Sequence, residues 1–537
     1  MDIFKKLTCG AKFKRKKYIT EKSIDIINNR SSNITVKQVD KELKESDKIS
    51  LIKSLEKIYI LRKQNKIYVY GTDIPEPISK FDDIISSSHQ TLFLNLIKLG
   101  YKDLTPVQMQ SLPLMIGRRE ILVCAPTGSG KTAAFLVPII IHLKHHKPKG
   151  FRALIISPTR ELCRQTYLFC KALTMGTKIR THLLPKMNNP KCVKYKDQNT
   201  SFDILLTTPN RLNFLLNNTP PLINLLNIEW LIIDESDKLF EIGFRDQLTN
   251  IYQACNTSIT RRAMFSATYS NQLDIWCKEN LYNYVTVCIG SRNTPTDTVQ
   301  QELYFAGNEA GKITGLKQLI QKGWGPPVII FVQSKERAQQ LYTRICDEKI
   351  NVDVIHSDRP QIERDRIVLE FRVGKIWTLI CTDLLCRGLD FKDVNLVINF
   401  DFPTTSISYI HRIGRTGRAG RTGKAITFFT HEDIPYLKPI YEIIKRSGNA
   451  SDILLPEYMM SLTAPPKNLK KLLKKRAIIR PRVGSDKIYS NKDGKAKRRK
   501  SIADNNVIAG NVIKVTKASA HKGKDRTKDK IKFSKFV

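Results

Sequence analysis

The sequence predicts an α/β protein with two domains, each built on a mostly parallel sheet with helices on both faces, flanked by basic, partly disordered tails. A chain of 537 residues is too long for one hydrophobic core. Short apolar runs alternate with amphipathic stretches in two blocks, which is typical of βαβ units. The formal net charge is +40, of which residues 1–70 carry +10 and residues 467–537 carry +19. The charge therefore lies mostly outside the two alternating blocks.

The composition shifts give the domain boundaries that we expect. In the N-terminal extension we predict one amphipathic helix, over about residues 49–61, because apolar residues recur there near helical spacing. The pattern predicts a basic N-terminal extension (1–75), a first domain (76–290), a linker (291–300), a second domain (301–455) and a basic C-terminal tail (456–537).

Runs of three to five apolar residues mark the expected strands, since strands of a parallel sheet are buried on both faces. In the first domain we expect strands at 121–124, 153–156, 204–206, 231–233 and 263–265. In the second domain we expect them at 328–332, 378–381, 396–400 and 425–429.

Composition excludes several classes of protein. No apolar run approaches the ~20 residues that span a bilayer, and the first residues lack the apolar core of a secretory signal. Eleven cysteines are scattered without a C-x-x-C pair. This usage argues against a disulfide framework and a structural zinc, and it suits a reducing compartment.

The segment Ala125-Pro126-Thr127-Gly128-Ser129-Gly130-Lys131-Thr132 lies between an expected strand and a helix opening at 133–137. A glycine turn between strand and helix directs backbone N–H groups and the helix N-terminus at an anion, as in a phosphate-binding loop. We call the segment 125–132 the P-loop, and it predicts that the first domain binds ATP. Lys131 would contact the β- and γ-phosphates, and Thr132 would hold Mg²⁺. Ala125 stands where the usual pattern begins with glycine, and a chance glycine turn is the alternative.

Asp234 and Glu235 directly follow the expected strand at 231–233. Carboxylates at a strand end are where an open α/β sheet presents ligands. Asp234 would hold Mg²⁺ largely through water, and Glu235 would orient or deprotonate the attacking water. The alternative is that the two acids cap a helix.

The second domain contains the cationic segment 411–418, His-Arg-Ile-Gly-Arg-Thr-Gly-Arg. Glycines separate its arginines, and this spacing indicates that guanidinium groups contact a phosphate. An exposed basic turn is the alternative. An arginine finger accelerates phosphoryl transfer by ~10³–10⁵. With the P-loop in one domain and the arginines in the other, hydrolysis would require closure of the cleft between them.

The basic tails indicate a polyanionic partner, because neutralising phosphates releases counterions. The run 495–500, Lys-Ala-Lys-Arg-Arg-Lys, is interpreted as a nuclear-import signal or a nucleic-acid patch. A solvated, solubilising tail is the alternative.

From about Phe81 to about Ser447 the motifs, in order and spacing, resemble the DEAD-box RNA helicases of superfamily 2. The resemblance implies two RecA-like domains, ATP and Mg²⁺ as cofactors, RNA held by its backbone without sequence preference, and RNA-dependent ATPase activity. It implies ATP contacts from Phe81, Gln108 (to the adenine edge), the segment 125–132 and Asp390 (to the ribose). It also implies hydrolysis by Lys131, Asp234, Glu235, His411, Arg415 and Arg418, the last two as arginine fingers.

The resemblance also assigns RNA and coupling residues. RNA contacts are implied for Pro158, Thr159, Arg160, Thr208, Arg211, Arg364 and Thr382. Coupling of hydrolysis to strand separation is implied for Ser266, Thr268 and Asp237, with His411 bridging towards them.

Three departures from the family pattern qualify this transfer. Ser236 replaces the usual alanine, Asn210 replaces a common glycine, and a Gly-Gly step is absent around 184–188. The Asp-Glu-Ser-Asp form, with Asp-Lys-Leu-Phe at 237–240 and Pro-Glu-Tyr-Met at 456–459, resembles one subgroup. That subgroup serves small-subunit ribosomal RNA processing in the nucleolus, which implies pre-ribosomal RNA, ribosome-assembly proteins as partners and a nuclear location. We expect a monomer without a membrane partner.

Our leading hypothesis is an ATP-dependent RNA helicase that unwinds or remodels short duplexes. An ATP-gated RNA clamp or assembly scaffold with little strand separation is the alternative from another class. A DNA helicase is a third, which Gln108 and Phe81 disfavour.

Overall fold

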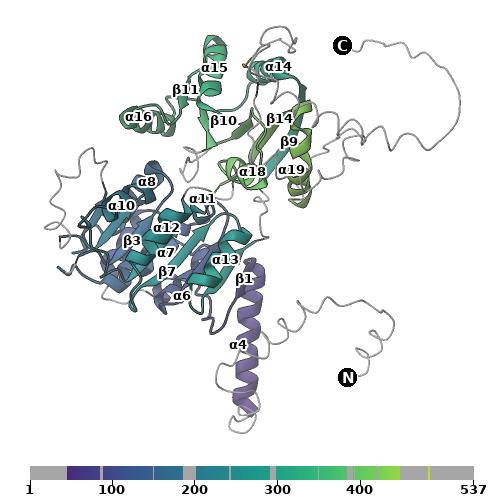
Figure 1. Cartoon of the computed structure of the whole chain (residues 1–537). Coiled ribbons are helices and arrows are strands. Elements are labelled where there is room, and N and C mark those ends of the chain that lie inside the picture. The colour runs from purple at the N-terminus through teal and green to yellow at the C-terminus, as the bar shows by residue number, and fades with distance from the viewer. Residues whose placement is uncertain are drawn as a thin grey trace, which may run out of the picture. The chain divides into compact units, whose positions relative to one another are not determined.

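A computed structural model of the whole chain gives two parallel-sheet lobes (Figure 1). The described residues of both lobes belong to one compact unit. The structure describes residues 45–84, 89–148, 150–184, 201–240, 244–290, 298–348, 350–383, 391, 394–418, 421–447, 480 and 482–483. Within these residues, every helix is too short or too polar to cross a membrane.

The sheet of lobe 1 contains eight strands in the order β1-β8-β2-β7-β6-β3-β5-β4. All neighbours are parallel except β1, which is antiparallel to β8 at one edge. Its strands are β1 (Ile67–Tyr70), β2 (Ile121–Cys124), β3 (Ala153–Ile156), β4 (Thr181–Leu183), β5 (Ile204–Thr207), β6 (Trp230–Asp234), β7 (Arg261–Ser266) and β8 (Val285–Ile289).

The sheet of lobe 2 contains six strands in the order β11-β12-β10-β13-β14-β9, all parallel. Its strands are β9 (Val299–Gly307), β10 (Val328–Val332), β11 (Val352–Ile355), β12 (Thr378–Thr382), β13 (Leu396–Asn399) and β14 (Gly423–Thr430).

Helices cover both faces of each sheet, and the described helices are these. Lobe 1 has α4 (Glu45–Gln64), α5 (Gln90–Lys98), α6 (Pro106–Ile116), α7 (Lys131–Leu143), α8 (Arg160–Leu173), α10 (Pro209–Leu216), α11 (Ser236–Leu239), α12 (Arg245–Ala254) and α13 (Asn271–Asn280). Lobe 2 has α14 (Glu309–Gln321), α15 (Lys335–Ile345), α16 (Gln361–Arg372), α18 (Ser406–Ile413) and α19 (Ile434–Arg446).

In each lobe, alternating residues of the buried strands pack into two hydrophobic clusters, one on each face of the sheet. In β2, Ile121 and Val123 pack with α6 and α7, whereas Leu122 packs on the opposite face with residues of α10, α12 and α13. In lobe 2, Ile329 faces α16, α18 and α19, whereas Ile330 faces α14 and α15. This alternation follows from the period of two in a β-strand, and it explains why the central strands β2, β3 and β10 are apolar at every position.

The expected fold class is confirmed: two mostly parallel sheets with helices on both faces. Every strand expected from an apolar run is present within one or two residues. The helix expected at 49–61 is longer, and β1, which follows it, joins the sheet of lobe 1 before residue 76. Residues 291–297 of the expected linker, and the basic run 495–500, lie outside the described residues.

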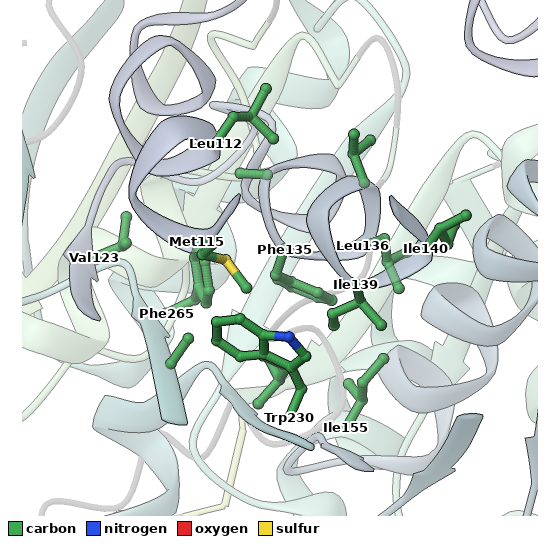
Figure 2. Packing of buried hydrophobic residues seen from close by; sticks show 14 of the residues in the cluster. Leu112, Met115, Val123, Phe135, Leu136, Ile139, Ile140, Ile155, Trp230 and Phe265 are labelled. Atoms are coloured by element: carbon green, nitrogen blue, oxygen red, sulfur yellow. The ribbon is translucent and has the colours of Figure 1, made fainter. Parts of the chain in front are cut away.

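The core of lobe 1 is centred on Trp230 at the start of β6. Figure 2 shows its indole among Met115, Phe135 and Phe265, which come from α6, α7 and β7. The indole Nε1 donates to His142 Nδ1 at 3.1 Å, so the polar edge of the ring is satisfied within the core. Because α7 starts at the P-loop, packing around Trp230 fixes the position of that loop.

Replacing this indole tests the importance of the core. Trp230→Ala removes a fully buried side chain, and we expect the free energy of unfolding to fall by about 3–5 kcal/mol. The control is Tyr282→Ala, because Tyr282 is 88% exposed and its loss should change stability by less than about 0.5 kcal/mol. Chemical denaturation followed by far-UV circular dichroism measures both. Equal midpoints for the two variants would contradict the assignment of this core.

Candidate functional site

The candidate residues of lobe 1 gather at the carboxyl edge of its sheet. The P-loop follows β2, Asp234 ends β6 and Ser266 ends β7. The strands β2, β7 and β6 are direct neighbours and parallel. Their ends therefore bring the three motifs to one edge, where open α/β sheets bind ligands.

The P-loop conformation requires glycine at two positions. Gly128 and Gly130 have φ values of +77° and +92°, in the left-handed region that L side chains rarely adopt. A β-carbon on Gly130 would also lie 2.6 Å from Gln108 Nε2. The turn leads directly into α7, whose first residue is Lys131. Such a glycine turn at a helix N-terminus is an anion site.

Lys131 is buried inside the loop that it belongs to. Its ammonium donates to the carbonyls of Ala125 at 2.8 Å and Pro126 at 3.0 Å. Burial lowers the pKa of Lys131, and the carboxylates of Glu235 and Asp234 oppose that shift. Phosphate oxygens would replace the two carbonyls as partners and give the cation stronger, charge-assisted bonds.

The two expected adenine-side residues take different positions. Gln108 is fully buried, accepts from the Thr105 amide at 3.0 Å and donates to the Gly130 carbonyl at 3.2 Å. It therefore braces the P-loop. Phe81 is 4% exposed and belongs to the hydrophobic core of lobe 1. Its contact with an adenine ring remains a prediction.

Asp234 and Glu235 form a buried acidic pair. The Glu235 amide donates to Asp234 Oδ1 at 2.9 Å, and Glu235 has a left-handed φ of +48°. Burial raises the pKa of Asp234, and the neighbouring Glu235 charge adds to the shift while Lys131 opposes it. The Glu235 Oε2 atom is buried and has no hydrogen-bond partner among the described residues. An orphaned carboxylate oxygen in this position fits a group that receives a water or a ligand.

A hydrogen-bond network connects these acids to lobe 2. Asp237 Oδ2 accepts from the Thr268 hydroxyl and lies 2.7 Å from His411 Nε2. The Ser266 hydroxyl donates to the Thr268 carbonyl at 2.7 Å. On its other side, His411 Nδ1 lies 3.9 Å from Glu235 Oε2. The three expected coupling residues and His411 are therefore in direct contact.

The cationic segment of lobe 2 contacts the P-loop. The Thr127 hydroxyl donates to the Gly414 carbonyl at 2.8 Å. A β-carbon at Gly128 would lie 3.3 Å from Arg418 Cγ. Arg415 is 1% exposed, and its Nε donates to the His411 carbonyl at 3.1 Å. Both expected arginine fingers therefore lie on the segment that touches the P-loop.

The expected RNA residues of lobe 1 lie at the same carboxyl edge, after β3 and β5. Pro158, Thr159 and Arg160 lead into α8, and the Thr159 hydroxyl caps that helix by accepting from the Leu162 amide. Thr208 precedes α10. The Arg211 side chain donates to the Leu184 carbonyl. Because β3 and β5 are adjacent and parallel, the two groups lie side by side.

Arg364 of α16 forms an ion pair across the lobes rather than standing exposed. Its guanidinium lies 2.8 Å from Glu161 Oε1 and donates to Gln361 Oε1 at 2.6 Å. Gln361 in turn donates to Glu161 at 3.2 Å. Our sequence analysis did not assign roles to Glu161 and Gln361. Their positions in the Pro-Thr-Arg-Glu-Leu and Gln-Ile-Glu-Arg motifs were the available signals.

Some expected features lie elsewhere. Thr382 ends β12 in lobe 2, paired with Val332 of β10. Asp390, most of the absent Gly-Gly region at 185–188, and the segment 456–459 lie outside the described residues. Ser236 is buried in α11, and its hydroxyl has no hydrogen-bond partner within the described structure.

Comparison with known proteins decides the family. Residues 105–275 match the DEAD/DEAH box helicase family, and residues 311–420 match the helicase conserved C-terminal domain. A relative from Bos taurus, "Probable ATP-dependent RNA helicase DDX52", is 46% identical over 88% of this chain and 80% of its own length. The chain belongs to the DEAD-box helicase family.

Other DEAD-box relatives agree. "ATP-dependent RNA helicase ROK1" of Saccharomyces cerevisiae is 38% identical over 83% of this chain and 88% of that protein. The solved structure of S. cerevisiae Dbp5 bound to RNA and ADP BeF3 has a TM-score of 0.61 and 28% identity, covering 74% of this chain and 99% of that one. The two sheets of this chain are therefore the paired RecA-like domains of a DEAD-box protein, and the family uses ATP.

The residues present fit a nucleoside triphosphate. The left-handed glycine turn, the buried Lys131 ammonium and the N-terminus of α7 converge on one point. The orphaned oxygen of Glu235 belongs to the buried acidic pair whose charges act on Lys131. This DEAD-box site therefore has cations for phosphates and carboxylates for water.

Replacing one glycine tests the loop geometry. In Gly130→Ala the left-handed φ costs about 1–2 kcal/mol, and the new methyl displaces Gln108. We expect ATP binding to weaken about tenfold or more, measured by titration with a fluorescent ATP analogue. Gly117→Ala is the matched control, because Gly117 has an ordinary φ of −72°. Unchanged affinity in Gly130→Ala would contradict the proposed phosphate cradle.

Proposed function

We propose that this DEAD-box protein unwinds or remodels short RNA duplexes during pre-ribosomal RNA processing and small ribosomal subunit assembly. Its biochemical activity is that of an ATP-dependent RNA helicase. The single observation that carries the mechanism is the shared Asp237 carboxylate, which contacts His411 of lobe 2 and Thr268 of lobe 1. Because His411 also lies 3.9 Å from Glu235 Oε2, this contact links closure of the lobes to the acidic pair of Asp234 and Glu235.

The P-loop residues are proposed to hold the triphosphate. Lys131 would neutralise the β- and γ-phosphates, the backbone of 125–130 would donate to their oxygens, and Gln108 would read the adenine edge. Mg²⁺, held by Thr132 and largely through water by Asp234, would neutralise charge on the phosphates. Asp390 is proposed to take the ribose hydroxyls.

Glu235 is proposed to act on the attacking water. Its Oε2 is buried, has no hydrogen-bond partner among the residues that the structure describes and lies 3.9 Å from His411 Nδ1, so it can accept a proton or fix the water by a hydrogen bond. Arg415 and Arg418 would stabilise the charge that develops on the γ-phosphoryl group. Both already lie on the segment of lobe 2 that touches the P-loop.

The RNA strand is proposed to lie along the carboxyl edges of both sheets. Pro158, Thr159, Arg160, Thr208 and Arg211 would hold it on lobe 1, and Arg364 and Thr382 on lobe 2. Phosphates and 2′-hydroxyls would carry the contact, so binding would be independent of sequence. Gripping one strand across two lobes would bend it and release its paired strand.

The cellular role is proposed from the resemblance to the Asp-Glu-Ser-Asp subgroup and from the charge of the tails. We propose pre-ribosomal RNA as the substrate, ribosome-assembly proteins as partners, and the nucleolus as the location. We also propose that the protein acts as a monomer and that its domains follow the boundaries given from the sequence, with β1 added to the first. Crosslinking of bound RNA in cells tests the substrate: a lack of pre-ribosomal RNA among the crosslinks would overturn it.

The role of Glu235 gives a quantitative expectation. Glu235→Gln keeps the shape of the side chain but removes its basicity, so kcat for RNA-stimulated ATP hydrolysis should fall by about 10²–10⁴ while RNA binding persists. Ser236→Ala removes a neighbouring hydroxyl that has no hydrogen-bond partner in the described part of the chain, so this variant should retain turnover close to wild type. A phosphate-release assay measures both, and wild-type turnover in Glu235→Gln would refute the assignment.

Lys131→Ala should abolish ATP binding and hydrolysis, because the variant leaves an uncharged space in the loop where the ammonium would contact the phosphates. Isothermal titration with a non-hydrolysable ATP analogue measures the first and phosphate release the second. Conversely, RNA-stimulated hydrolysis at the wild-type rate in this variant would contradict the proposal that Lys131 binds the phosphates.

Strand displacement distinguishes a helicase from an ATP-gated clamp. With a short RNA duplex that has a single-stranded extension, we expect ATP-dependent release of the labelled strand, and stimulation of ATPase by RNA rather than DNA. ATP hydrolysis without displacement would favour the clamp or scaffold.

A further inference from the structure

A hydrogen-bonded clamp around Pro75 joins the N-terminal extension to lobe 1. Arg62, in the last turn of α4, donates from Nε to Gln110 Oε1 at 2.9 Å and from Nη2 to the Pro75 carbonyl at 3.0 Å. Gln110 of α6 donates from Nε2 to the same carbonyl at 3.0 Å. We call these three residues the Arg62 clamp. Because each of them is bonded to the other two, the end of α4, the chain at Pro75 and the middle of α6 are held together.

The clamp also satisfies a buried amide. Gln110 is fully buried, and its side-chain oxygen accepts from Arg62 while its side-chain nitrogen donates to Pro75. A buried polar atom that loses its partner carries the full cost of its desolvation. Loss of Arg62 would take this donor away from Gln110 Oε1, so the amide would no longer hold the Pro75 carbonyl in one position.

The segment after Pro75 follows α6 towards Gln108. The Ile78 amide donates to the Met109 carbonyl at 2.9 Å. The contacts of the segment with α6 therefore step back from Gln110 to Met109, next to Gln108, which braces the P-loop. The same short stretch of α6 carries one member of the clamp and the residue that we propose reads the adenine edge.

A local turn then sets the position of Phe81. The amides of Ser79 and Lys80 donate to Asp83 Oδ2 at 3.2 and 3.0 Å. Phe81 starts the short helix η1 (Phe81–Asp83) inside this turn and packs in the core of lobe 1. Only residues 76–80 separate the clamp from this ring. A displacement of the Pro75 carbonyl is therefore passed to Phe81 through a short, hydrogen-bonded stretch of chain.

We propose that Arg62 and Gln110 are positioning residues for the adenine side of the nucleotide site, so that the N-terminal extension sets how well the enzyme selects ATP over GTP. They act through Phe81 and Gln108, by holding the segment 75–83 against α6. This inference rests on the proposed function, because it takes Phe81 and Gln108 as the contacts of the adenine ring.

Residues that position the base contacts should act on nucleotide binding rather than on chemistry. The base takes no part in phosphoryl transfer, so its contacts are equally strong in the ground state and the transition state. Loss of such uniform binding raises KM and leaves kcat unchanged. A nucleotide whose base does not match the contacts loses little when they shift. The clamp therefore predicts a KM effect that is large for ATP and small for GTP.

Two variants open the clamp and two serve as controls. Arg62→Met and Gln110→Met remove the polar groups but keep unbranched side chains that fill similar space. Lys63→Met is the matched control for charge, because Lys63 is the exposed neighbour of Arg62 on α4. Arg119→Met is the structural comparator, because Arg119 donates to the carbonyls of residues 72–73 and so holds an earlier part of the same segment.

The first measurement is steady-state, RNA-stimulated hydrolysis of ATP and of GTP by the full-length protein. In both clamp variants we expect KM for ATP to rise about tenfold, with kcat and with KM for GTP within about twofold of wild type. Both nucleotides meet the same folded fraction, so partial unfolding does not change the ratio of the two KM values. Lys63→Met and Arg119→Met should keep the wild-type ratio. An unchanged ratio in Arg62→Met, or an equal change in Arg119→Met, would overturn the proposal.

The second measurement uses inorganic tripolyphosphate as a competitive inhibitor, because it carries no base. Its inhibition constant in Arg62→Met should equal that of the wild type. A rise similar to the rise in KM for ATP would place the effect at the phosphates and would overturn the adenine role of the clamp.

A double variant tests whether the two residues act as one unit. Arg62→Met combined with Gln110→Met should have the same KM for ATP as either single variant, because each one already opens the clamp. Effects that multiply would contradict a shared clamp. Failure of the proposed function would appear differently, as a wild-type protein that lacks RNA-stimulated ATPase activity or that hydrolyses GTP as well as ATP.

Discussion

The Asp237 carboxylate is the point on which the two lobes of this protein depend. One of its oxygens accepts from Thr268 of lobe 1 and lies within hydrogen-bond distance of His411 of lobe 2. In a buried environment such a shared acceptor is strong when both partners are present and unfavourable when one leaves. A displacement of either lobe therefore disturbs the side chains beside the P-loop, which gives a physical route from RNA grip to ATP hydrolysis.

Both lobes bury charged side chains at the carboxyl edge of their sheets. In lobe 1, Lys131 is buried together with Asp234, Glu235 and Asp237. Glu235 Oε2 has no hydrogen-bond partner in the part of the chain that the structure describes, so it is available to a reactant. In lobe 2, the network around Asp401 is compact and densely ion-paired. The first edge therefore keeps a carboxylate oxygen that can accept a hydrogen bond from a reactant, whereas the carboxylate at the second edge is paired with cations.

The interlobe contacts away from the nucleotide site form a second seam. Glu161 of α8 holds Arg364 and Gln361 of α16, and Arg164 pairs with Asp365 on the same two helices. Because α8 begins at Arg160, the last of the proposed RNA residues 158–160, this one helix joins the seam to the proposed RNA contacts. The DEAD-box family motifs thus lie where strands end and helices begin, since these are the positions that a parallel sheet places side by side.

The sequence alone determined most of the strands, the P-loop and the family, because apolar runs buried on both faces and glycine turns with φ above zero leave few alternatives. It missed the strands β1, β4, β8, β9 and β11, whose alternating or short patterns give weak signals. The tertiary structure alone decided that Phe81 lies in the core, that Arg364 pairs with Glu161, and that Arg480 pairs with Asp433 of lobe 2. These outcomes depend on which residues meet across long stretches of chain, and local residue pattern contains no information about such partners. A buried charge is stable only where its partner lies, and only the folded chain sets that place.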